Sequence, residues 1–243
     1  MSASIIHYVQ GLPYRDLGLT PDKILGVPAE QATADDVAKL GKAEFMQLFY
    51  ASKCPAAGDL DGEYRARTLE MGILHPAASI ITHRIWGPGR WLGKAIGAGS
   101  QEGYNIFSHT STPPIPPSSL SPSPVGSMSL SEKKEDGGGV SGGSSLYVEL
   151  PSDTRRGRCF RFSQFSESVF DRGESSRMDY SSARSGKNGP LFGGMRDEVR
   201  KVNDRLFVGL GYIQAFGGKY NSAPFVMEGP PVKKFTGPDK PEQ

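Results

Sequence analysis

The sequence has little cysteine and no long apolar run, and both absences restrict where the protein works. Its two cysteines, Cys54 and Cys159, lie far apart without partners at metal-ligand spacing, so we expect neither a disulfide scaffold nor a zinc site. No stretch reaches the ~18 apolar residues of a membrane-spanning helix, and residues 1–18 lack the basic start and apolar core of a signal peptide. These features predict a soluble cytoplasmic protein without a transmembrane segment, although a cleaved organelle presequence stays open.

A strong excess of one charge is also missing. The formal net charge is +2, and the basic residues form no run with interleaved aromatic residues, so we expect no nucleic-acid partner. The four histidines do not cluster, which argues against a metal site. The glycines of 209–218 (GLGYIQAFGG) are followed by neither Lys-Ser/Thr nor a helix start, and no G-x-S-x-G motif occurs. We therefore predict no cofactor and no serine nucleophile.

What the sequence does contain is a series of short strand patterns separated by turn residues. Glycine (31 residues) and proline (19) punctuate them, and alternation is clearest at 195–228. Such a meander predicts a mainly β protein, an antiparallel up-and-down β-barrel of lipocalin or fatty-acid-binding type with N-terminal helices. The expected strands are 60–69, 90–96, 103–107, 146–150, 157–165, 177–181, 195–202, 206–213 and 223–228.

Helix signals and composition divide the chain further. Pro21 after Thr20 predicts a one-turn helix ending at Gly26, and Thr33 caps a longer helix that packs one face on the main body. A short apolar helix is expected from Pro76. We therefore predict a helical segment at 1–58, a barrel domain at 59–232 and a flexible tail at 233–243. Within the barrel domain, the Ser/Pro/Gly-rich residues 110–145 predict a disordered insertion.

Four side chains are candidates for catalysis. Glu63 and Asp179 each precede a tyrosine on an expected strand, and a buried carboxyl group there would have a raised pKa suited to acid–base work. His83 titrates near neutrality. Arg196 would bind a carboxylate or polarise a carbonyl if it faced the barrel interior. The alternative for the charged strand residues is a solvent-facing ladder, and for His83 a surface position on a helix.

The segment 196–200 leaves open which of its faces looks inward. Arg196, Glu198 and Arg200 share one face, whereas Asp197 and Val199 share the other. If the first face is luminal, its charges form the polar end of a ligand site. If Asp197 is luminal instead, it becomes the candidate acid.

Aromatic side chains would supply the apolar wall of such a site, with ordinary core packing as the alternative. The predicted ligand-binding residues are Tyr64, Trp86, Trp91, Phe107, Tyr180, Glu198, Arg200 and Tyr212, with Phe160 and Phe162 as further aromatic neighbours.

Five short motifs follow one another in a recognisable order. They are Gly62-Glu63-Tyr64, Trp91-Leu92-Gly93-Lys94, Asp179-Tyr180, the segment 196–200, and Phe207 with Gly209. This order resembles the lipocalin-like proteins that combine a GXWXG-type domain with a companion domain of unknown function. The resemblance covers about half of the chain, and Gly-Glu-Tyr stands where that family has its tryptophan motif. It implies a small β-barrel and leaves the activity open.

These features predict a barrel whose interior binds a small, mainly apolar metabolite such as a lipid, terpenoid or polyketide. The protein would then be either a carrier or a cofactor-free isomerase, cyclase or dehydratase that works by acid–base catalysis. The alternative is a non-catalytic structural or assembly subunit that docks on a protein partner.

Overall fold

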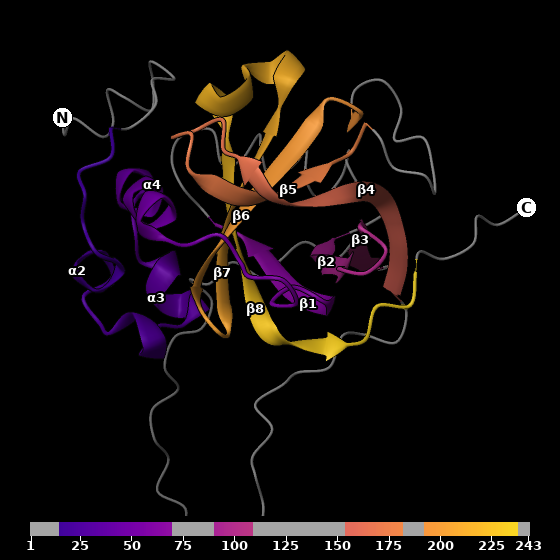
Figure 1. Ribbon diagram of the computed structural model, residues 1–243, viewed down its shortest axis with the longest axis horizontal. Coiled ribbons are helices and arrows are strands. Elements are labelled where there is room, and N and C mark those ends of the chain that lie inside the picture. Colours follow the sequence, from indigo (N-terminus) through magenta and orange to yellow (C-terminus); the bar gives the residue numbers. More distant parts are fainter. Residues whose placement is uncertain (1–14, 70–89, 109–153, 182–191, 238–243) are drawn as a thin grey trace, which may run out of the picture.

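Eight antiparallel strands close into a barrel in sequence order, and the last strand returns to pair with the first (Figure 1). The predicted up-and-down β-barrel with N-terminal helices is therefore confirmed. The computed structural model describes residues 15–69, 90–108, 154–181 and 192–237. The strands are β1 (Gly62–Thr68), β2 (Trp91–Gly97), β3 (Glu102–Ser108), β4 (Thr154–Glu167), β5 (Glu174–Asp179), β6 (Met195–Asn203), β7 (Leu206–Ile213) and β8 (Ala223–Lys233).

The helices differ from the sequence prediction at one point. Thr33 does form a capping box with Asp36, but the helix that it starts, α3 (Ala34–Ala38), is short. A second helix, α4 (Lys42–Ala51), begins after Gly41, whose backbone N–H donates to Glu44. The prediction of one long helix is wrong, because each of these two local caps starts a helix of its own. The remaining short helices are α2 (Pro21–Leu25), η1 (Ala29–Gln31), η4 (Gln214–Phe216) and η5 (Gly218–Asn221).

The helices lie against the side wall of the barrel (Figure 1). Phe45, Leu48 and Phe49 of α4 are fully buried, and they share a hydrophobic cluster with the outward-facing residues of β7, which include Val208 and Leu210. Burying each side chain of this size contributes about 1.5–3 kcal/mol. The outer face of β7 is thus as apolar as its inner face, which explains why the sequence of this strand shows little polar alternation.

A second hydrophobic cluster lies in the barrel interior. Strand alternation sends every second side chain inward, so that β7 contributes Phe207 while its neighbour Val208 packs outside. The luminal cluster contains Leu60, Tyr64, Ala66, Trp91, Ile96, Phe107, Phe160, Phe162, Met178, Tyr180, Phe192, Val199, Phe207, Phe225 and Met227.

Several sequence predictions fall outside the described residues. These are the helix expected from Pro76, the strand at 146–150, the insertion at 110–145 and the end of the tail at 238–243. Within the described part of the chain, no helix is long and apolar enough to cross a membrane.

Candidate functional site

One face of β6 looks into the barrel and the other looks outward. Asp197 pairs with Met178 of β5 and points into the barrel, as does Val199, which belongs to the luminal cluster. Glu198 and Arg200 point outward, toward the helices and the β4–β5 connection. Of the two possibilities that the sequence left open, the structure therefore places Asp197 inside.

Asp197 belongs to a polar cluster in the middle of an otherwise apolar interior. Lys94 of β2 donates from Nζ to Asp197 Oδ2 at 2.6 Å, to the Tyr180 hydroxyl at 2.7 Å and to Asn105 Oδ1 at 2.9 Å. The Tyr180 hydroxyl in turn donates to Asp197 Oδ2 at 2.8 Å. All four side chains are at most 1% exposed. We call Lys94, Asn105, Tyr180 and Asp197 the luminal polar cluster.

Aromatic rings surround the Lys94 ammonium group. Its Nζ lies 5.2 Å from the ring centroids of Trp91 and Phe225, and 5.5 Å from those of Phe160 and Tyr180. A cation at such distances is attracted by the electron-rich faces of the rings. The Trp91 indole N–H also donates to Asn105 Oδ1, so one of the rings is itself tied to the polar cluster.

Two luminal glycines make this arrangement possible. A Cβ atom on Gly103 would lie 2.2 Å from the Phe160 ring, and one on Gly209 would lie 2.2 Å from the Phe225 ring. Any side chain at either position would displace an aromatic ring from the neighbourhood of Lys94. Gly103 in β3 and Gly209 in β7 thus each create space for an aromatic ring.

Burial changes the proton affinities within the cluster. Desolvation lowers the pKa of Lys94, and the adjacent Asp197 carboxylate opposes that change. Desolvation raises the pKa of Tyr180 well above its usual value, and the charge of Asp197 adds to the increase. Tyr180 therefore remains a protonated hydrogen-bond donor at neutral pH, while Lys94 gives up its proton more readily than an exposed lysine.

One atom of the cluster has no partner among the described residues. Asp197 Oδ1 is buried and accepts no hydrogen bond there, although Oδ2 accepts two. A Cβ atom on Gly211 would lie 2.7 Å from Oδ1, so this oxygen faces a position on β7 that carries no side chain. An unsatisfied buried carboxylate oxygen costs free energy, and native proteins contain few of them. Asp197 Oδ1 is thus a ready acceptor for a hydroxyl or N–H group of a bound molecule.

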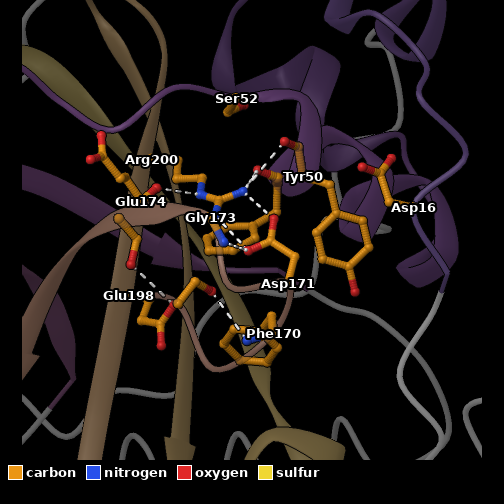
Figure 2. Close-up of polar contacts among 12 residues, drawn as sticks. Asp16, Tyr50, Ser52, Phe170, Asp171, Gly173, Glu174, Glu198 and Arg200 are labelled. Atoms are coloured by element: carbon orange, nitrogen blue, oxygen red, sulfur yellow. Dashed lines mark hydrogen bonds and ion pairs between the residues drawn. The ribbon is translucent and has the colours of Figure 1, made fainter. Parts of the chain in front are cut away.

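A second polar network lies outside the barrel, between α4, the β4–β5 connection and β6 (Figure 2). The Arg200 guanidinium makes two hydrogen bonds of 2.7 Å to Asp171 and further bonds to the carbonyl oxygens of Phe49, Tyr50 and Glu174. Arg200 is 2% exposed. It therefore joins the end of α4 to the barrel wall.

Glu198 belongs to the same side of β6 and is fully buried. Its carboxylate accepts from the Val169 backbone N–H at 3.0 Å and from the Ser175 hydroxyl at 3.1 Å. Burial raises the pKa of Glu198. For Asp171 burial acts in the same direction, but the Arg200 guanidinium outweighs it and holds the pKa below its usual value. We call Asp171, Glu198 and Arg200 the outer polar network.

The other predicted site residues occupy different parts of the molecule. Tyr64, Trp91, Phe107, Phe160, Phe162 and Tyr180 are luminal, whereas Tyr212 lies in the cluster beneath the helices. Glu63 faces outward and pairs with Arg156 and Tyr104. Asp179 and Arg196 pair with each other on the outer surface. His83 and Trp86 lie outside the described residues. The structure thus brings Trp91 and Tyr180 together with Asp197, and it places three of the predicted catalytic residues, Glu63, Asp179 and Arg196, outside the lumen.

Sequence reasoning missed Lys94, Asn105 and Phe225. The available signal was the lone charge of Lys94 within the apolar strand WLGKAIG, because a lysine there must either face solvent or find a buried partner. The register shift between Trp91 and Gly93 places both Trp91 and Lys94 inside, although an uninterrupted strand would send residues three apart to opposite faces. Among the described residues, no group of three or more His, Cys, Asp or Glu side chains is arranged to hold a metal ion.

Comparison with known proteins adds little to this geometry. No family model matches the sequence, and no curated protein matches it. Among solved structures, the chain is similar to one described as the crystal structure of a protein from Thermomonospora curvata, at 16% sequence identity and a TM-score of 0.43. That similarity covers 82% of this chain and 97% of the other.

Proposed function

We propose that the barrel binds one small, mainly apolar molecule whose polar group hydrogen-bonds to the luminal polar cluster. The observation that carries this proposal is the unsatisfied Asp197 Oδ1 in an otherwise hydrogen-bonded cluster. Small-molecule sites are mostly apolar and contain a few convergent polar groups that fix the orientation of the ligand. The aromatic rings around Lys94 and the acceptor oxygen of Asp197 match this composition.

The same cluster contains the groups that acid–base catalysis without a cofactor requires. Asp197 can accept a proton from a carbon or hydroxyl group of the ligand. Lys94 and Tyr180 can donate hydrogen bonds to an oxygen that becomes negatively charged, as in an enolate. An isomerase, cyclase or dehydratase reaction would use both roles. The proposed catalytic groups are therefore Lys94, Tyr180 and Asp197.

Native mass spectrometry of the purified full chain tests this function. We expect a small molecule to be retained by the wild-type protein and released on extraction. The double variant Lys94→Met/Asp197→Leu should lose it, because both charged groups of the luminal polar cluster are then absent. A wild-type protein that carries no small molecule but co-purifies with a large protein partner would contradict the proposal and support an assembly subunit instead.

A further inference from the structure

We propose that Lys94 forms a covalent imine with an aldehyde or ketone, which makes carbonyl compounds the ligand class of the luminal site. This inference rests on the proposed function, and it adds a bond-forming step to it. Lys94 is the only lysine that is buried in the described part of the chain. Its Nζ reaches the centre of the luminal cluster and lies 2.6 Å from Asp197 Oδ2, the carboxylate that the proposed ligand contacts.

The neighbours of Lys94 supply each proton transfer that the reaction needs. The ammonium group passes a proton to Asp197 Oδ2 at 2.6 Å, and the resulting amine attacks the carbonyl carbon. The carbonyl oxygen takes that proton from Asp197 as the C–N bond forms, with the Tyr180 hydroxyl as a hydrogen-bond donor to the same oxygen. The attacking nitrogen, now positively charged, returns a proton to Asp197, and Asp197 passes it to the new hydroxyl group. The hydroxyl group leaves as water while the nitrogen lone pair completes the C=N bond, so ammonium plus carbonyl gives protonated imine plus water and no oxidant or reductant is needed.

The site also suits the product. A protonated imine is a cation at the position of the former ammonium group, so it keeps the four aromatic rings and the Asp197 carboxylate as its surroundings. Desolvation, which lowers the pKa of Lys94, favours the unprotonated amine and hence the attack. The luminal side chains next to the amine are apolar, like the hydrocarbon part of the ligand, and they slow the entry of water that would hydrolyse the imine.

Reductive trapping tests the proposal. The full chain is incubated with limiting octanal and sodium cyanoborohydride, and the adduct is located by peptide mapping. Lys39 is the internal reference, because it also pairs with an aspartate, Asp36, but its side chain is 72% exposed. We expect at least about tenfold more label on Lys94 than on Lys39, because burial favours the unprotonated amine only at Lys94. The label should be absent at this position in Lys94→Arg.

Binding of octan-1-ol separates the two proposals. The alcohol has the same chain but cannot form an imine. If octan-1-ol binds and octanal leaves Lys94 unlabelled, the imine is excluded and the binding function stands. If octan-1-ol does not bind and Lys94 is labelled no more than Lys39, both proposals fail. Labelling of Lys94 with saturable alcohol binding supports both.

Discussion

Adjacent residues of β6 belong to two buried polar networks with opposite properties. Asp197 faces the luminal polar cluster, while Glu198 and Arg200 face the outer polar network. Outside the barrel, Arg200 makes bonds to one carboxylate and three backbone carbonyls, and it joins α4 to the wall. Inside, Asp197 leaves one oxygen without a partner among the described residues.

This difference indicates that the buried charges of the outer polar network stabilise the fold, whereas we propose that those of the luminal polar cluster bind a ligand. A buried ion pair whose remaining hydrogen bonds are made holds elements together, and removing one partner is strongly destabilising. A buried carboxylate with an unsatisfied oxygen can still accept a hydrogen bond from a ligand. The two networks therefore predict different responses to substitution: loss of stability for the outer one, and loss of binding for the luminal one.

The largest effect on stability is expected at Arg200. Replacement Arg200→Met leaves Asp171 without its ion-pair partner and removes the Arg200 donor from the carbonyls of Phe49 and Tyr50, which should lower the free energy of unfolding by about 3–5 kcal/mol. Urea denaturation measures it. The control is Arg67→Met, which breaks the exposed pair with Asp35 and should cost at most about 1 kcal/mol. If both variants lose the same unfolding free energy, the outer polar network does not stabilise the fold more than an exposed ion pair does.

The luminal pair should respond differently when both partners are removed. Lys94→Met alone leaves the Asp197 carboxylate buried without its counter-charge and should cost about 3 kcal/mol. In Lys94→Met/Asp197→Leu the buried charges are gone, so stability should return to within about 1 kcal/mol of wild type. Ligand binding should be absent in both variants. A double variant as unstable as the single one would mean that the luminal pair is structural.

The smallest effect is a contrast in pH dependence within the outer network. The raised pKa of Glu198 stabilises the fold below the ordinary carboxyl pKa, and this contribution is lost as pH rises through the folded-state pKa. The lowered pKa of Asp171 has the opposite sign: its contribution is present above the ordinary carboxyl pKa and is lost as pH falls. Glu198→Gln should therefore gain stability relative to wild type as pH rises, and Asp171→Asn should lose it. Denaturation midpoints of wild type and both variants, measured across the acidic pH range, test these changes. If the stability of each variant runs parallel to that of wild type over this range, the assigned pKa shifts are wrong.

The sequence was sufficient for the fold but not for the site, for a physical reason. Alternation in 195–202 and 206–213 predicts strands, and the turn residues between them predict a meander. Alternation defines two faces, however, and only packing decides which one is inside. Because α4 covers β7 with Leu48 and Phe49, the outer face of the wall is apolar too, and Glu198 and Arg200 are as buried as Asp197.

Lys94 shows a second reason why the sequence does not predict the site. Its inward position depends on the irregular register between β2 and β3, and its partners come from β3, from β6 and from Tyr180, the residue after β5. No local pattern brings Asn105, Tyr180 and Asp197 to one point, since they are far apart in the sequence. Trp91 and Tyr180 do lie in the lumen, whereas Tyr212, an aromatic residue predicted for the same site, packs on the outer face of β7.

The most direct test of the account is a calorimetric titration of the full chain with octan-1-ol. It compares wild type with Asp197→Asn and with the matched control Asp204→Asn, which makes the same change at an exposed aspartate beyond β6. We expect saturable binding at one site in wild type and in the control. Binding should be at least about tenfold weaker in Asp197→Asn, since a hydrogen bond to a charged group contributes ~1.5–3 kcal/mol. Equal affinities in all three proteins would show that Asp197 is not the polar contact of a luminal ligand.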